Sequence, residues 1–210
     1  MKKNLQKILA ATVALTSISL ASQALAKTEG SYVGVNLSRV NSSHQYERSG
    51  VTASNFAKFD NSATGFGVNY KYAISLNNFF LAPGIFYEKL GTKADSIGDE
   101  GDTSISVNSR YGAKLDFGYD IADNFAMYLT GGLANVSYKV DWADVTGQKK
   151  SGNKVGAILG IGANYYPHKN ISLNLEYNFQ TLDLATPDNG GVNQAKTDIS
   201  TIQIGAAYHF

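Results

Sequence analysis

Residues 171–180 read ISLNLEYNFQ, a stretch in which apolar and polar side chains alternate without a break. Successive side chains of a β-strand point to opposite sides, so a period of two gives a strand one apolar and one polar face. The apolar face carries Ile171, Leu173, Leu175, Tyr177 and Phe179, and the polar face carries Ser172, Asn174, Glu176, Asn178 and Gln180. The stretch therefore predicts a strand that separates two different environments.

Seven further segments after Gly30 show the same period. The eight segments span about residues 31–40, 63–74, 79–89, 105–119, 125–140, 154–166, 171–183 and 198–210. Their connections alternate between short ones, at 75–78, 120–124 and 167–170, and long polar ones, at 41–62, 90–104, 141–153 and 184–197. Strands that run up and down would place all tight turns at one end and all long loops at the other. This arrangement is typical of a bacterial outer-membrane barrel.

The polar face decides between a membrane barrel and a soluble one. A soluble lipocalin-type barrel would keep its apolar face inside and carry many Lys and Glu residues outside. Here the polar face is rich in small residues, which suits the crowded interior of an eight-stranded barrel. Its glycines are Gly34, Gly65, Gly67, Gly112, Gly118, Gly156, Gly160, Gly162 and Gly205. The predicted fold is all-β, an eight-stranded antiparallel up-and-down transmembrane β-barrel with its bulky apolar face toward lipid.

Two of these segments raise a question of local geometry. Pro83 lacks the N–H group that a ladder needs, so we expect a bulge or a local break in the segment 79–89. The segment 105–119 is interpreted with one phase throughout, which puts Ile105 and Val107 on the lipid face with Tyr111.

The pair Gly131-Gly132 interrupts the pattern of the fifth segment. Ala134, Val136 and Tyr138 follow the glycines out of phase with the apolar residues that precede them. We therefore expect a change of register at the two glycines.

The N-terminus has the features of an export signal. Lys2, Lys3 and Lys7 precede an apolar stretch of about 13 residues, too short to span a membrane, and Ala24-Leu25-Ala26 fits a cleavage site. We expect residues 1–26 to be a cleaved signal peptide and residues 27–210 to be the barrel domain. The latter carries 15 basic and 17 acidic residues, a net charge of −2, and no cysteine. Nucleic-acid binding, disulfides and thiolate metal sites are therefore not expected.

The chain resembles the small eight-stranded outer-membrane barrels of the OmpA, OmpX and opacity-protein family. The resemblance is carried by the eight segments, the sorted loops, the stretch APGIFYEKLG at 82–91 and the final AYHF at 207–210. It implies a location in the bacterial outer membrane, in contact with its lipid. In this family the outer-membrane assembly machinery recognises the last strand, so the resemblance implies this role for Ile204, Tyr208 and Phe210.

Six charged residues fall on the face assigned to the lumen: Lys71, Glu88, Arg110, Lys114, Asp116 and Glu176. They can be interpreted as an ion path or as a buried network of salt bridges. We expect the network, because isolated charges are costly inside a protein and because side chains fill an eight-stranded barrel.

Enzymatic activity is not expected. Some relatives in the resembled family modify lipids, but here His44, His168 and His209 lie in no recognisable catalytic motif. The acidic loop with Asp95, Asp99, Glu100 and Asp102 lacks the ligand spacing of a calcium site. We expect no catalytic residue, no metal and no cofactor.

The long loops are the remaining place for function, because loops on a rigid scaffold often carry binding residues. The first one, 41–62, contains Tyr46, Arg48, Phe56 and Phe59, which suit either a protein-binding surface or packing on the loop's own stem. Tyr138 and Trp142 are expected in an aromatic girdle at the membrane surface. The function predicted is adhesion to host or matrix proteins or another surface interaction. A narrow porin and a lipid-modifying enzyme remain as alternatives.

Overall fold

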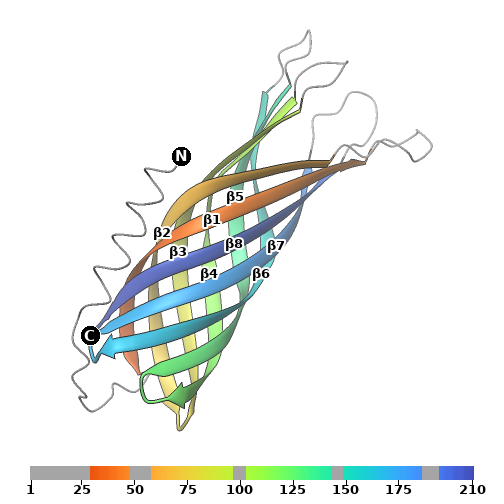
Figure 1. Cartoon of the computed structure of the whole chain (residues 1–210). Helices are drawn as coiled ribbons and strands as arrows, with labels where there is room; N and C mark the ends of the chain where they lie inside the picture. Colours follow the sequence, from red (N-terminus) through yellow and green to blue (C-terminus); the bar gives the residue numbers. More distant parts are fainter. Residues whose placement is uncertain (1–28, 48–57, 97–102, 143–148, 186–193) are drawn as a thin grey trace, which may run out of the picture.

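The computed structural model describes residues 29–47, 58–96, 103–142, 149–185 and 194–210. These residues form a closed antiparallel barrel in which every strand pairs with its neighbours in the chain and β8 closes against β1 (Figure 1). The strands are β1 Gly30–Glu47, β2 Lys58–Leu76, β3 Phe79–Ser96, β4 Thr103–Ala122, β5 Phe125–Trp142, β6 Lys149–His168, β7 Ile171–Ala185 and β8 Gln194–His209. All eight predicted segments are strands, and the predicted fold class is confirmed.

The three connections predicted to be short are tight turns at one end of the barrel (Figure 1). Only residues 77–78, 123–124 and 169–170 separate the paired strands there. Asn77 has a φ of 61°, a left-handed conformation that asparagine tolerates better than most residues. At the opposite end the strands are longer than predicted, because residues 41–47 and 58–62 belong to β1 and β2 rather than to a loop.

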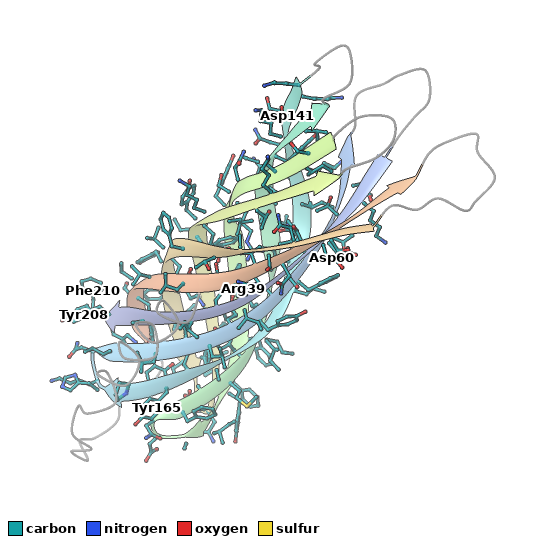
Figure 2. All side chains as sticks on the ribbon, turned by 45° about the horizontal axis from the view of Figure 1, so that its top comes forward. Arg39, Asp60, Asp141, Tyr165, Tyr208 and Phe210 are labelled. Carbon is teal, nitrogen blue, oxygen red and sulfur yellow. The ribbon has the colours of Figure 1, made fainter. Side chains whose placement is uncertain are left out.

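The two faces of the wall lie as predicted near the turn end. Large apolar side chains such as Leu115, Phe117, Leu129 and Ile204 are about half exposed on the outside. The inner face is crowded: a Cβ atom on Gly112 would lie 2.0 Å from the backbone carbonyl oxygen of Leu133. Figure 2 shows Tyr165, Tyr208 and Phe210 projecting from this end of the barrel, with Asp60 and Asp141 toward the other.

Toward the loop end, the apolar side chains change from the outer to the inner face. In β5 the outward residues run from Leu129 and Leu133 to Ser137, while Val136 and Val140 are fully buried inside. The register with β4 and β6 continues through Gly131-Gly132, so the predicted register change at the glycines is wrong. The pattern reverses because the outer face is in contact with lipid near the turns and with water near the loops.

In β4 the phase does change, at a bulge. Val107 pairs with Tyr138 and Ser109 with Ser137, so Asn108 is the extra residue. Ile105 and Val107 are therefore buried inside the barrel, and their predicted place on the lipid face is wrong. An extra residue in one strand moves every later side chain to the other face.

At Pro83 the ladder is interrupted without a bulge. The pairing of β2 with β3 stops at Lys71–Gly84 and resumes in the same register at Ile74–Leu81. On its other side Pro83 stays paired with Leu115 of β4. The expected local break is confirmed, and it affects one neighbour only.

Above the lipid-facing part, the wall divides into two four-stranded lobes. Pairing between β2 and β3 ends at Phe66–Lys89, and pairing between β6 and β7 ends at Ile158–Gln180. Beyond these two seams, β7-β8-β1-β2 stay paired as the first lobe and β3-β4-β5-β6 as the second lobe. In Figure 1 the green and teal strand ends diverge from the gold, orange and blue ones.

The inner faces of the two lobes pack on each other as the sheets of a β-sandwich do. Their contact is the apolar cluster formed by Val40, Leu182 and Ile199 of the first lobe and Leu90, Ile105, Val107, Val136, Tyr138 and Val140 of the second. The external part of the protein thus has its own dry core. Among the described residues, no helix is long and apolar enough to cross a membrane.

Candidate functional site

Arg110 and Glu88 form the outermost ion pair in the lumen. They are cross-strand partners in β4 and β3, and both are fully buried. The Arg110 Nε donates to Glu88, and a second guanidinium nitrogen donates to the Thr201 hydroxyl at 3.3 Å. The Gln203 amide also donates to the Glu88 carboxylate. Each charge therefore has two partners, the opposite charge and a polar side chain of β8.

Glu176 is the centre of the second group of charges. Its carboxylate accepts from the Lys114 Nζ at 2.5 Å, the Tyr128 hydroxyl at 2.8 Å and the Asn178 amide at 2.7 Å. Lys71 lies 3.8 Å from the same carboxylate and 2.5 Å from that of Asp116. Low-dielectric surroundings make such pairs costly to break.

All six predicted lumen charges therefore meet inside the barrel, as three cations and three carboxylates. Glu88, Arg110, Asp116 and Glu176 are at most 2% exposed, Lys114 is 9% exposed, and the Lys71 side chain is 16% exposed. The aromatic rings of Phe86 and Tyr128 lie near the cations: the Lys114 Nζ is 5.0 Å from the Phe86 ring centroid. The sequence prediction missed Tyr128, Asn178, Thr201 and Gln203, although the same alternation places them on the inner face.

The charged layer lies between two apolar layers. Along β4 the inward side chains pass from Asp116 through Lys114 and Arg110 to Val107 and the apolar cluster between the lobes. On the side of the turns the lumen is filled by Tyr32, Ala73, Phe80, Ala82, Ala126, Tyr128 and Tyr166. A cavity of about 30 Å³ beside Lys71 and Asp116 has room for water. Buried apolar side chains therefore occupy the lumen on both sides of the charged layer.

Of the four predicted loop-contact residues, two lie in strands and two lie outside the described residues. Tyr46 lies in β1, opposite Ala195, and Phe59 lies in β2, opposite His44, so the prediction that both belong to a loop is wrong. Arg48 and Phe56 lie outside the described residues, and so do the side chains of Tyr46 and Phe59.

The predicted membrane anchor at Tyr138 is also wrong. Its side chain is 6% exposed and belongs to the apolar cluster between the lobes. The inward phase of β5 beyond the lipid-facing part explains this position. The side chain of Trp142 lies outside the described residues.

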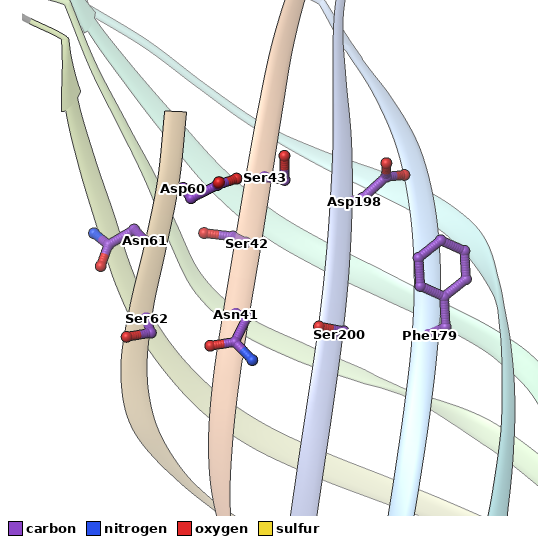
Figure 3. A pocket seen from close by; sticks show the side chains of 9 residues that line it. All are labelled: Asn41, Ser42, Ser43, Asp60, Asn61, Ser62, Phe179, Asp198 and Ser200. Atoms are coloured by element: carbon purple, nitrogen blue, oxygen red, sulfur yellow. The ribbon is translucent and has the colours of Figure 1, made fainter. Parts of the chain in front are cut away.

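The outer wall of the first lobe carries a groove of about 470 Å³ (Figure 3). It crosses the four strands just beyond their last lipid-facing residues. Its lining is Asn41, Ser42, Ser43, Asp60, Asn61, Ser62, Phe179, Asp198 and Ser200. Sequence reasoning did not single out these residues, because they lie on four strands and meet only through the register of the lobe.

The residues of the predicted assembly signal lie on the lipid-facing surface. Ile204, Tyr208 and Phe210 are 46%, 51% and 76% exposed, and the rings of the last two are in edge-to-face contact. Their recognition by the assembly machinery stays a prediction.

The structure describes the side chains of two of the three histidines, His168 and His209. His209 is buried beside Tyr32, with ring centroids 3.9 Å apart, and the His168 Nδ1 accepts from the Asn170 backbone N–H. Neither is bonded to a serine hydroxyl among the described residues. In the same part of the chain, no group of three or more His, Asp or Glu residues is arranged to hold a metal ion.

Comparison with solved structures supports the barrel fold. OprG of Pseudomonas aeruginosa is 16% identical, with a TM-score of 0.53 over 88% of this chain and 98% of that chain. The protease OmpT of Escherichia coli is 10% identical, with a TM-score of 0.52 over 91% and 100%. Ail, the attachment invasion locus protein of Yersinia pestis, is 17% identical, with a TM-score of 0.45 over 87% and 99%. It is the likenesses to OprG and OmpT that support the fold, and they concern the fold alone.

No curated protein sequence matches the chain. A family model does: the outer membrane protein beta-barrel domain matches residues 10–210. The lipid-facing wall, the filled lumen and the closed antiparallel barrel agree with this match. The chain is therefore a small eight-stranded barrel of the bacterial outer membrane and belongs to the outer membrane protein beta-barrel domain family.

Proposed function

We propose that this protein acts at the cell surface, where its two external lobes and the loops at their tips bind host or matrix proteins. It catalyses no reaction, and its lumen conducts no ions. The observation that carries this proposal is the filled lumen, in which paired charges lie between two apolar layers. A barrel without a free path has its accessible side chains on the outside.

The external lobes supply a suitable platform for binding. Beyond the two seams the strands stay paired within each lobe up to Gln45–Lys58 in the first and Ser96–Thr103 in the second. A dry core between the lobes fixes their relative position. Rigid strands that end in loops are a common basis for protein binding, because the scaffold limits the entropy lost on association.

The test is to shorten the loops without cutting the lobes. Residues 48–57, 97–102, 143–148 and 186–193 are each replaced by Asn-Gly, a two-residue turn that strands accept. Binding to host cells and to immobilised matrix proteins should fall to the level of cells without the protein. Arg48→Ala and Phe56→Ala should each weaken it when the first loop is left intact.

The control replaces the turn residues 123–124 by Asn-Gly at the other end of the barrel. This variant should bind as the unchanged protein does. Full binding by the protein with all four shortened loops would disprove the role of the loops.

A further inference from the structure

Seven of the nine residues that line the groove on the first lobe belong to two rows of outward side chains. The lower row runs across four strands as Phe179, Ser200, Asn41 and Ser62, each directly opposite the next in the ladders. The upper row, two residues farther along, runs as Thr181, Asp198, Ser43 and Asp60. Figure 3 shows the groove residues on these neighbouring strands. The sheet therefore brings together groups that are up to 159 positions apart in the chain.

The lining selects a class of ligand. It offers hydroxyl and amide groups, two carboxylates and one aromatic ring, and no lysine or arginine is among its nine residues. Within this lining an anion would meet two carboxylates. A sugar, in contrast, has hydroxyl groups that donate to carboxylate and amide oxygens, and a C–H face that packs on an aromatic ring. The ring of Phe179, 43% exposed, lies at one end of the lower row.

One outward hydroxyl group of the lining lacks a partner. The hydroxyl oxygen of Ser43 is buried, and it makes no hydrogen bond within the described part of the chain. The neighbouring Ser42, 2% exposed, belongs to the inner face of the strand together with Val40. Buried polar groups nearly always have a partner, so the orphan hydroxyl of Ser43 points to a ligand or water that supplies one.

The groove also lies at the height of the sugars that border an outer leaflet. Below its lower row come Tyr177, Ile202, Arg39 and Thr64, and below these the fully apolar row of Leu175, Ile204, Leu37 and Phe66. Successive rows are about 7 Å apart along the strand. The guanidinium of Arg39, exposed at the boundary, donates to the Ser62 hydroxyl of the groove. A cation at this level suits the phosphate of a glycolipid whose sugar would lie above it.

We propose that this groove is a saccharide-binding site for an uncharged hexose unit. The sugar belongs either to a glycolipid of the outer leaflet or to a free glycan. The proposal rests on the proposed function only in placing the ligand outside the cell. Its residues lie in strands, so the protein with shortened loops keeps the groove: loss of adhesion and loss of sugar binding can be told apart.

The test uses the full barrel in phospholipid vesicles, with a panel of uncharged hexose oligosaccharides as the first probe. Saturation-transfer NMR and titration should detect binding. Phe179→Leu, which keeps an apolar side chain but removes the ring, and Asn41→Ala should each weaken it about tenfold, the effect of about 1.4 kcal/mol. The matched controls are Tyr177→Leu, on the same strand one row lower, and Ser109→Ala, outward on the second lobe. Neither control should change the binding.

The second probe distinguishes the source of the sugar. Vesicles contain either an outer-membrane glycolipid with its core sugars or the same lipid with the sugars removed. If the purified protein retains only the intact glycolipid, and Phe179→Leu and Asn41→Ala do not retain it, the groove binds the membrane's own lipid. Binding of the free oligosaccharides would assign it to a soluble or host glycan.

Three results would overturn the proposal. The first is that neither probe binds. The second is that both bind equally well to Phe179→Leu, Asn41→Ala and the controls. The third is that the groove binds Ca²⁺ through Asp60 and Asp198 but no sugar. Heat-dependent gel mobility verifies that each variant has folded, so a loss of binding reports on the groove itself.

Discussion

Gly131 and Gly132 are neighbours in β5 with opposite surroundings. A Cβ atom on Gly132 would lie 2.2 Å from the backbone carbonyl oxygen of Ala113, whereas one on Gly131 would meet nothing closer than 3.9 Å. Gly132 points into the lumen, where the backbone of β4 cannot move away. Gly131 points to the lipid side, where there is room for a methyl group. Of these two positions, only position 132 therefore requires glycine.

Replacement of each glycine by alanine tests this difference. Gly132→Ala should lower the free energy of unfolding by about 1–3 kcal/mol or more, the usual effect of overpacking. Gly131→Ala should be neutral or slightly stabilising, because alanine restricts the unfolded chain. Urea unfolding in lipid vesicles measures both, and similar values for the two variants would contradict the crowding seen at Gly132.

Glu88 provides a second test at this scale, because it is the carboxylate partner of the fully buried Arg110. Glu88→Ala leaves a buried cation unpaired and should cost about 3–5 kcal/mol of unfolding free energy. The double variant Glu88→Met with Arg110→Met should recover most of this loss. Lys139→Met is the control: its pair with Asp141, at 3.1 Å and with the Lys139 side chain 43% exposed, should contribute less than about 1 kcal/mol.

The strands could be predicted from sequence, but not the environment along each strand. Alternation identifies the two faces of β7 and β8 and places Glu176 and Arg110 inside. It does not show that the apolar residues change from the outer to the inner face along a strand. Val136 and Tyr138 looked like a slipped register, although β5 only passes from lipid to water. The bulge at Asn108 has no signal in the alternation of one chain.

The lobes and the groove could not be predicted from the sequence for a related reason. A seam is the absence of pairing between two strands that both look regular, such as β2 and β3 beyond Phe66–Lys89. The groove joins Phe179 to Asn41 and Ser62 through the register of three ladders. Register depends on partners that are distant in the chain, which the pattern of one segment does not reveal.

The seams can be tested with engineered cysteines, since the chain has none of its own. Asn41→Cys with Ser62→Cys joins paired residues of the first lobe and should form a disulfide on mild oxidation. Ser62→Cys with Lys93→Cys extends the β2–β3 register across the seam, where the strands are not paired, and should not form one. A disulfide requires Cα atoms within about 7 Å. Efficient cross-linking of both pairs on a non-reducing gel would mean that the wall is continuous.

At the scale of the whole molecule, we propose that the barrel is a solid support rather than a conduit. The charged layer contains three cations and three carboxylates, all paired, and apolar layers lie on both sides of it. Moving an ion through this region would require breaking several buried pairs at once. The surface that remains for function is the external one: the groove, the lobes and the loops.

Conductance in a planar bilayer tests the filled lumen most directly. The purified, folded protein should insert without producing steps of current in concentrated KCl. Heat-dependent gel mobility and co-sedimentation with the lipid verify that the protein has folded and inserted. Reproducible steps from the unchanged protein, altered when Arg110 or Glu176 is neutralised, would show an ion path through the barrel and contradict the account.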